Sequence, residues 1–279
     1  MAELLGGLHH VTSFAGAPGK NVAFHRDVLG LRLVKTTVNF DDPGTLHLYF
    51  GDEVGSPGTI FTSFPSPRHA PGRSGTPEIA SILVEGDGAS MDSWRASGGA
   101  EVTQTGVVLR DPDGITYRCR EGKGVRLAGV SVRVPQPEDT ASFLVSVLGF
   151  ERSADGACQV VSPSGVVRVE FEASNRDRPR LGAGSIHHVA WRVPDEDAQA
   201  RVAAALRQAG VAATPVQDRN YFRSIYFRIP GGVLFEVATD GPGFAVDEPV
   251  ESLGEALCLP AQFESRRAEL EANLPSLDA

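Results

Sequence analysis

Four short stretches recur along the chain and decide its fold: LHHVTSF (Leu8–Phe14), IASILVE (Ile79–Glu85), LAGVSVRV (Leu127–Val134) and IHHVAWRV (Ile186–Val193). In each stretch apolar residues alternate with others, which is the period of a β-strand. A segment with helical spacing follows each one, and these segments are Asn21–Leu29, Ser90–Ser97, Asp139–Leu148 and Asp195–Ala209. Such self-similarity indicates a repeat architecture.

A turn followed by a strand closes each repeat. The four closing segments are Pro57–Thr62, Pro112–Arg118, Pro163–Val169 and Pro230–Glu236. Pro and Gly supply the turns, and the high content of 31 Gly and 19 Pro fits many short strands joined by tight turns. Each repeat is therefore predicted to be a βαβββ module. One module cannot bury both faces of its curved sheet, so the modules should pair.

The predicted fold class is α+β, with four βαβββ modules that form two cupped mixed β-sheets and a C-terminal helical tail. The stretch Glu121–Val125 is the best boundary between two halves. We expect an N-terminal domain over residues 1–122 with modules one and two, a C-terminal domain over residues 126–240 with modules three and four, and a tail over residues 241–279.

The composition excludes several classes of protein. Hydrophobic residues make up 41% and charged residues 22%, as in ordinary globular proteins. The net charge of −9 argues against a nucleic-acid groove. No apolar run approaches the roughly 20 residues that a membrane helix needs, and Met1 is followed by Ala-Glu, so we expect neither a span nor a secretion signal. Cys119, Cys158 and Cys258 form no CxxC pair, which favours a reduced, cytoplasmic setting.

A comparison of the repeats singles out three residues. Aligned on the first strands, the equivalent positions are His10, Ala80, Gly129 and His188. Aligned on the turn glycines, the positions in the last strands are Thr62, Arg118, Val169 and Glu236. If modules one and four share a sheet, the side chains of His10, His188 and Glu236 meet in its hollow. Two imidazoles and one carboxylate are the facial triad of non-haem Fe(II) oxygenases, which leaves coordination positions open for chemistry.

Each HHV triplet contains a second histidine, His9 or His187. Neighbours on a regular strand point to opposite faces unless a bulge intervenes. We expect the later histidine of each pair to be the ligand, and for His9 and His187 a core position and a position beside the metal both remain open. Two further residues lie close in the sequence to Glu236. Tyr226 could donate a hydrogen bond in the same hollow and Arg219 could neutralise an anion, but an interfacial aromatic and a surface cation are equally compatible.

At these residues the sequence resembles the vicinal oxygen chelate superfamily (glyoxalase, bleomycin resistance protein and extradiol dioxygenase), whose unit is the βαβββ module. Within it, the chain is similar to four-module ring-cleaving dioxygenases that act on para-hydroquinones. The resemblance covers nearly the whole chain, and it rests on Leu8–Thr12, His47–Asp52, Gly55–Thr59, Phe61–Pro65, Ile186–His188, Tyr221–Arg228 and Pro230–Glu236.

The resemblance implies Fe(II), or less often Mn(II), held by His10, His188 and Glu236. It also implies positions beside the metal or against the substrate for a further set of residues, namely His9, Thr12, His187, Arg219 and Tyr226. Proton movement would fall to His187, His9 or Tyr226, and stabilisation of negative charge to Arg219.

The expected function is a non-haem Fe(II)-dependent ring-cleaving dioxygenase of the extradiol type. Its expected partners are O₂ and a small hydroquinone-type or catechol-type phenol, with no nucleic acid and no membrane, and a homo-oligomer is compatible. One alternative is a glyoxalase-type metal-dependent lyase or isomerase, which would usually bring a second Glu where Thr62 stands. The other is a non-catalytic protein that binds an aromatic compound, which would need no triad.

Overall fold

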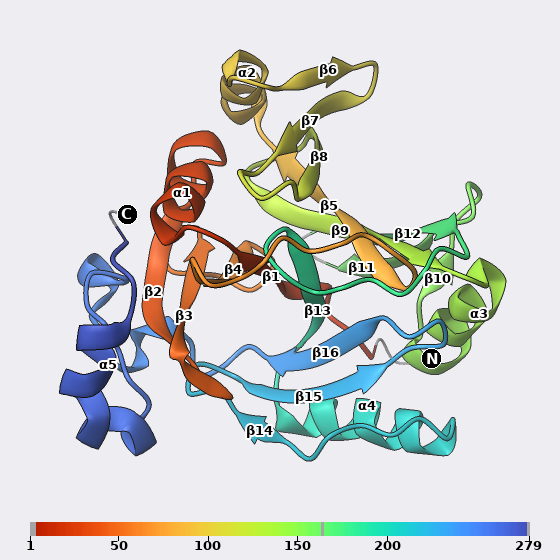
Figure 1. Ribbon diagram of the computed structural model, residues 1–279. Coiled ribbons are helices and arrows are strands. Elements are labelled where there is room, and N and C mark those ends of the chain that lie inside the picture. The colour runs from red at the N-terminus through yellow and green to blue at the C-terminus, as the bar shows by residue number, and fades with distance from the viewer. Residues whose placement is uncertain (1–3, 163–164, 278–279) are drawn as a thin grey trace.

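Two eight-stranded sheets make up most of the computed structural model, which describes residues 4–162 and 165–277 (Figure 1). The order in the first sheet is β14 (Gln217–Asp218), β15 (Arg223–Arg228), β16 (Leu234–Thr239), β13 (Ser185–Val193), β1 (Leu8–Ala15), β4 (Ile60–Pro65), β3 (Asp42–Gly51), β2 (Arg32–Asn39). The order in the second is β10 (Glu151–Arg152), β11 (Cys158–Ser162), β12 (Gly165–Ala173), β9 (Arg126–Val134), β5 (Glu78–Gly86), β8 (Thr116–Glu121), β7 (Gly106–Arg110), β6 (Glu101–Thr103). Both sheets mix parallel and antiparallel pairs, which confirms the predicted α+β class.

Each sheet combines one module from the N-terminal half of the chain with one module from the C-terminal half. Modules one and four form the first sheet, so strands from both ends of the colour scale lie together in Figure 1. Modules two and three form the second. The sharing of one sheet by modules one and four is thereby confirmed. The division into domains at residues 122–126 puts one module of each half into each sheet, and it stays a prediction.

Helices cover parts of the sheets and build the tail. They are α1 (Pro18–Ala23), the π-helix η1 (Phe24–Val28), α2 (Gly88–Ala96), α3 (Pro137–Leu148), α4 (Glu196–Gln208), the 3₁₀-helices η2 (Phe244–Val246), η3 (Val250–Ser252) and η4 (Ala261–Arg266), and α5 (Arg267–Asn273). Local sequence explains several ends. The carboxylates of Asp87 and Asp195 accept backbone hydrogen bonds at the starts of α2 and α4, and Gly149 ends α3 in the left-handed conformation. None of the helices in the described ranges is long and apolar enough to cross a membrane.

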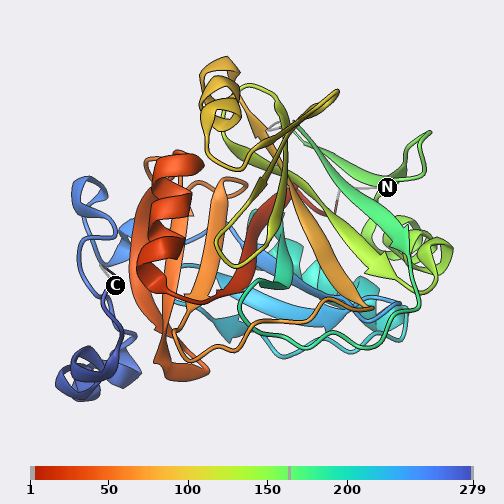
Figure 2. The same cartoon turned by 45° about the horizontal axis from the view of Figure 1, so that its top comes forward.

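The two sheets are connected by two linkers, residues 66–77 and 174–184. Backbone hydrogen bonds join the linkers to each other, among them Arg73 to Arg180 and Gly72 to Ala183. Figures 1 and 2 show them running side by side between the sheets. The turn predicted at Pro163 and Ser164 lies outside the described residues. The tail packs along β2, where the Cys258 amide donates to the Thr36 carbonyl.

One β-bulge in the first strand of each module sets the register. The extra residues are His9, Ala80, Ala128 and His187, each skipped by its antiparallel partner strand. The second-sheet positions equivalent to His10 and His188 are therefore Ser81 and Gly129. The alignment of Ala80 with His10 in the sequence was wrong by one residue, because the bulge has no local signal in the sequence.

The same register corrects the comparison of the last strands. Glu236 pairs with Ala190, two residues after His188, and the equivalent pair in module three joins Glu170 to Ser131. Val169 is thus not the counterpart of Glu236, and a carboxylate at this position is not unique to module four. Glu170 forms an ion pair with Arg118, its counterpart in module two. At Gly129 a Cβ atom would lie 2.1 Å from the Arg168 carbonyl oxygen, so this position admits no histidine.

Acid is expected to destabilise the fold through His25 in η1. Its ring stacks on Phe50 with centroids 4.3 Å apart, and Nδ1 contacts the Asn21 carbonyl oxygen at 2.9 Å. Burial lowers the pKa of His25 from 6.5 to about 4. The unfolded chain therefore takes up a proton before the folded one, and the free energy of unfolding falls by about 3 kcal/mol as the pH drops from 6.5 to 4. Chemical denaturation at pH 7 and pH 4 measures this loss, which His25→Phe should reduce. An unchanged loss in that variant would contradict the assignment.

Candidate metal centre and active site

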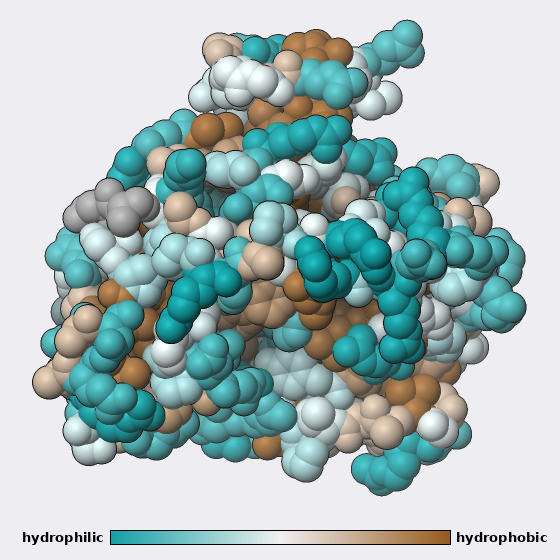
Figure 3. Space-filling model, viewed as in Figure 1, coloured by the Kyte–Doolittle hydropathy of each residue, from teal (hydrophilic) through white to brown (hydrophobic). Residues whose placement is uncertain are grey.

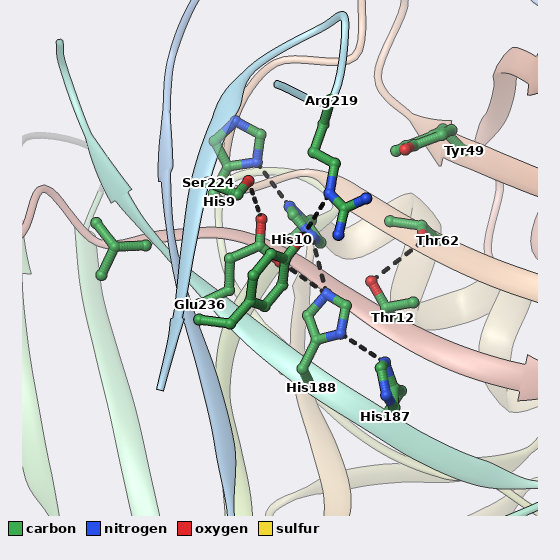
Figure 4. A network of polar contacts seen from close by, with 12 residues as sticks. His9, His10, Thr12, Tyr49, Thr62, His187, His188, Arg219, Ser224 and Glu236 are labelled. Carbon is green, nitrogen blue, oxygen red and sulfur yellow. Dashed lines mark hydrogen bonds and ion pairs between the residues drawn. The ribbon is translucent and has the colours of Figure 1, made fainter. Parts of the chain in front are cut away.

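Three buried side chains from adjacent strands converge in the first sheet (Figure 4). They are His10 of β1, His188 of β13 and Glu236 of β16. The two Nε2 atoms lie 3.3 Å apart, and Glu236 Oε2 lies 3.3 Å from His10 Nε2 and 2.8 Å from His188 Nε2. The structure thus brings together the three predicted ligands, with one ligand atom of each at a common point.

The neighbouring histidines fix which nitrogen of each ligand faces that point. His10 Nδ1 lies 2.9 Å from His9 Nδ1, and His188 Nδ1 lies 2.9 Å from His187 Nδ1. Burial, followed by the charge of His10, lowers the pKa of His9, whereas a hydrogen bond to the Thr239 backbone raises it. If the neutral His9 ring carries its hydrogen on Nε2, it accepts at Nδ1. His10 then donates from Nδ1 and presents the lone pair of Nε2 to the centre.

A divalent metal fits this arrangement of donor atoms. Glu236 Oε1 accepts a hydrogen bond from Ser224, whereas among the described residues no hydrogen bond reaches the buried Oε2. Burial raises the pKa of Glu236, whereas His10 and His188 lower it by a larger amount. The net shift is downward, so the carboxylate is charged. A buried carboxylate oxygen without a hydrogen-bond donor is favourable only with a positive partner, and a metal ion between Oε2 and the two Nε2 atoms would supply one. Two nitrogens and one oxygen suit a divalent metal ion and leave coordination positions open.

His9 and His187 lie beside the ligands because each is the extra residue of a bulge. The bulge turns His9 to the same side as His10, with ring centroids 5.1 Å apart, and does the same for His187 and His188 at 4.9 Å. The opposite-face arrangement of a regular strand is therefore excluded for both pairs. Burial lowers the pKa of His187 to about 3, so this ring is neutral.

Tyr226 and Arg219 lie over the triad. Tyr226 pairs with Glu236 across β15 and β16, and its ring meets that of His188 at 5.7 Å. Arg219 Nε donates to the Tyr226 hydroxyl oxygen at 3.2 Å, and Arg219 Nη2 donates to Asp41 Oδ2 at 3.1 Å. Burial raises the pKa of Tyr226 far above its usual value of 10, so at neutral pH this residue is a hydroxyl donor. Both predicted residues therefore reach the site.

Thr12 lies two residues beyond His10 and belongs to a chain of polar side chains. Thr62 Oγ1 donates to Thr12 Oγ1 at 3.2 Å and lies 2.7 Å from His47 Nε2. The Tyr49 hydroxyl oxygen lies 3.0 Å from His47 Nδ1. Thr62 occupies the place equivalent to Glu236, and its hydroxyl is engaged by protein groups.

A cavity of about 50 Å³ lies against the triad. Three aromatic rings wall it, those of Phe40, Phe64 and Phe222, and its polar lining outside the histidine pairs consists of Thr12, Asn39, Asp41, His47, Tyr49, Arg219 and Tyr226. Phe222 also packs on the rings of His9 and His10. The Arg219–Asp41 ion pair joins the two loops that border the cavity, which explains why it is smaller than a typical ligand pocket.

A second cavity, of about 760 Å³, lies beneath the linkers and shares His187 with the first. Figure 3 shows this face of the molecule, where hydrophilic side chains surround a central hollow with apolar side chains in it. His187 is the one residue that borders both cavities within the described ranges.

The structure adds four residues to the site for which the sequence patterns indicate no role, namely Ser224, His47, Tyr49 and Phe222. Ser224 stands two residues before Tyr226, so strand alternation could have placed it on the same face. His47 and Tyr49 alternate in the same way on β3. Phe222 lies in a loop, where alternation gives no indication.

Comparisons with known proteins agree with this architecture. The sequence profile of the Glyoxalase/Bleomycin resistance protein/Dioxygenase superfamily matches residues 126–237. The chain is 37% identical to MhqO of Bacillus subtilis (strain 168), named as a ring-cleaving dioxygenase, over 98% of this chain and 97% of that protein. It is 31% identical to the chlorohydroquinone/hydroquinone 1,2-dioxygenase of Sphingobium indicum, over 97% and 96% of the two chains.

Solved structures give the same result. A crystal structure of a dioxygenase from Bacillus subtilis superposes with a TM-score of 0.88 at 36% identity, covering 98% of this chain and 97% of the other. Glyoxalase I from Zea mays superposes with a TM-score of 0.63 at 14% identity, covering 84% and 92%, and shares the fold alone. Because relatives that match over nearly the full length are up to 37% identical to it, the chain belongs to the glyoxalase/bleomycin resistance protein/dioxygenase superfamily.

Proposed function

We propose that this protein is a ring-cleaving dioxygenase that opens a hydroquinone-type phenol with O₂, with Fe(II) held by His10, His188 and Glu236. The observation that carries the proposal is the convergence of these three buried ligand atoms next to a cavity with aromatic walls, which His10 and His188 border. The full-length relatives with ring-cleaving and hydroquinone dioxygenase names support the same reaction class.

The side chains around the triad would divide the work. Bound Fe(II) supplies a Lewis-acidic, redox-active centre with open positions for a phenol oxygen and dioxygen. His9 and His187 hold the two ligand rings in orientation through their Nδ1 atoms. Tyr226 holds a proton at its hydroxyl oxygen, and Arg219 beside it offsets negative charge that develops in the cavity. Phe40, Phe64 and Phe222 give the aromatic ring apolar contacts.

Two other functions fit the observations less well. A glyoxalase-type lyase or isomerase would usually require a fourth protein ligand, and the hydroxyl of Thr62, which occupies that place, hydrogen-bonds to Thr12 and His47 instead. A protein that only binds an aromatic compound would have no use for the converging triad. Mn(II) in place of Fe(II) is compatible with the same ligands.

The proposed setting is the cytoplasm. Cys119, Cys158 and Cys258 are free thiols in the structure. A reducing compartment keeps such thiols reduced, and it also keeps iron in the ferrous state that the proposed reaction needs.

An oxygen-electrode screen tests the proposal. Protein purified without oxygen and analysed for metal is mixed with catechol, hydroquinone, methylhydroquinone or chlorohydroquinone. We expect oxygen uptake with at least one para-diphenol by protein that contains iron. Protein that contains iron but takes up no oxygen with any of the four would contradict the proposed function.

A further inference from the structure

Four side chains form a continuous hydrogen-bonded chain beside the triad: Tyr49, His47, Thr62 and Thr12. The successive contacts are 3.0 Å from the Tyr49 hydroxyl to His47 Nδ1, 2.7 Å from His47 Nε2 to Thr62 Oγ1, and 3.2 Å from Thr62 Oγ1 to Thr12 Oγ1. All three contacts lie within hydrogen-bond range. The chain crosses the neighbouring strands β3, β4 and β1, whose pairing fixes these separations.

A consistent set of donors and acceptors runs through this chain. If Tyr49 donates to His47 Nδ1, His47 carries its hydrogen on Nε2 and donates to Thr62, and Thr62 donates to Thr12. The Thr12 hydroxyl is then left with its own hydrogen to give. After a proton has passed along the chain, His47 carries its hydrogen on Nδ1 instead of Nε2. Only a neutral imidazole permits both arrangements. Burial, followed by the charges of His10 and His188, lowers the pKa of His47, so the ring is neutral.

Both ends of the chain border the cavity at the triad. Thr12 and Tyr49 line it, whereas Thr62, in the middle, does not. Thr12 lies beside the metal ligands on β1, and Figure 4 shows Tyr49 on the far side of Thr12 and Thr62 from Glu236. Thr12, Thr62 and Tyr49 are buried, so bulk water does not compete for their hydrogen bonds. The protein thus links two places of one cavity through its own side chains.

We propose that Tyr49, His47, Thr62 and Thr12 form a proton relay that takes the proton from the second hydroxyl of a para-diphenol and releases it at Thr12 beside the metal ligands. The inference rests on the proposed function and names the substrate class of the site. The hydroxyls of a para-diphenol lie on opposite sides of the ring, so one can reach the triad while the other reaches Tyr49. The hydroxyls of a catechol lie on adjacent carbons, so a catechol does not need a relay between two distant places of the cavity.

The transfer balances without a further co-reactant. The O–H bond of the second hydroxyl breaks and a new O–H bond forms at Tyr49, whose own proton passes to His47 Nδ1. The Nε2 proton of His47 passes to Thr62, and the Thr62 proton passes to Thr12, which gives its proton to an oxygen atom that comes from the O₂ consumed in the proposed reaction. One proton has moved from one end to the other, no electrons have left the relay, and His47 has changed tautomer.

Thr62→Val tests the relay because valine keeps the shape of threonine and removes the hydroxyl that joins His47 to Thr12. We expect kcat for hydroquinone to fall by about a hundredfold, in the range of a lost acid–base step, with KM and iron content within about twofold of the wild type. Thr62→Ser restores the hydroxyl and should recover most of the loss. The deficit should be smaller for chlorohydroquinone than for methylhydroquinone, because chlorine makes the second hydroxyl more acidic and less dependent on the relay.

Thr140→Val is the matched control. It removes another buried threonine hydroxyl, one that donates to the Pro230 carbonyl oxygen at 2.8 Å from helix α3, and it should leave kcat unchanged. Wild-type turnover by Thr62→Val, or an equal deficit in Thr62→Val and Thr62→Ser, would overturn the relay and leave the proposed function standing. Wild-type protein without oxygen uptake would overturn both.

Discussion

Replacing Glu236 by glutamine is expected to abolish oxygen uptake and to lower the affinity for metal by at least about a hundredfold. Loss of a residue that only hydrogen-bonds to a metal ligand already lowers metal affinity by up to about a hundredfold, so loss of a ligand should cost at least as much. Glu236 brings the negative charge of the triad, and its Oε2 is the buried oxygen that no hydrogen bond satisfies among the described residues. Glutamine has nearly the same size and can still accept the hydrogen bond from Ser224. The fold should therefore persist while the metal is lost. Anaerobic Fe(II) titration measures the affinity.

Glu170→Gln is the control for this variant, since Glu170 is the counterpart of Glu236 in the second sheet. Its carboxylate pairs with Arg118 at a half-exposed position, and Ser81 and Gly129 stand at the strand positions equivalent to His10 and His188. We expect unchanged iron content and turnover. If Glu236→Gln bound iron as tightly as the wild type, Glu236 would not be a ligand.

The largest expected loss of stability follows from replacing Lys35 by methionine. The Lys35 ammonium is completely buried, 2.5 Å from Asp247 Oδ1, in contact with Glu248 and 3.7 Å from Cys258 Sγ. It neutralises the one further group of metal-type ligands found in the described ranges, Asp247, Glu248 and Cys258, and joins the tail to β2. Methionine keeps the bulk but leaves the buried Glu248 carboxylate without its counter-charge, so the free energy of unfolding should fall by about 3–5 kcal/mol.

Chemical denaturation at neutral pH measures this loss, and Arg267→Met serves as the comparison. Arg267 pairs with Glu264 and Glu271 on the exposed face of the tail, where an ion pair contributes less than about 1 kcal/mol. A similar small loss in Lys35→Met would show that Lys35 does not hold the tail in place. The pKa of Glu248 is lowered, because Lys35 outweighs the opposing effect of burial. The stabilisation is therefore present above the ordinary glutamate pKa and is lost as the pH falls through the lowered one.

The repeats made the modules and the triad predictable. Strand alternation, turn residues and two HHV triplets recur at equivalent places, so His10, His188 and Glu236 could be identified without coordinates. The bulges could not be predicted. An extra residue changes the hydrogen-bonded register, but the alternation in the sequence can still be read in two ways. Counting four residues from each turn glycine aligned Val169 with Glu236, whereas the strand pairing aligns Glu170 with it. The single-residue uncertainty of the bulges aligned Ala80 with His10, whereas the strand pairing aligns Ser81 with it. It also left the directions of His9 and His187 open.

Contacts between distant segments were also beyond the sequence. Lys35 and Asp247 are separated by most of the chain, and nothing near either residue indicates the other. The same holds for Arg219 and Asp41, which meet only because β2 and β14 bring their loops to the same cavity. The relay from Tyr49 to Thr12 depends on the pairing of β3, β4 and β1, which the module pattern predicts only in outline.

Analysis of the product tests whether this centre opens the aromatic ring. Iron-loaded protein is given hydroquinone under labelled dioxygen, and the product is identified by mass spectrometry beside the oxygen consumed. We expect an open-chain product that gains both atoms of one dioxygen molecule, with one molecule consumed per hydroquinone and no product from Glu236→Gln. A product that keeps the ring intact, such as a quinone without label, would contradict ring cleavage at this centre.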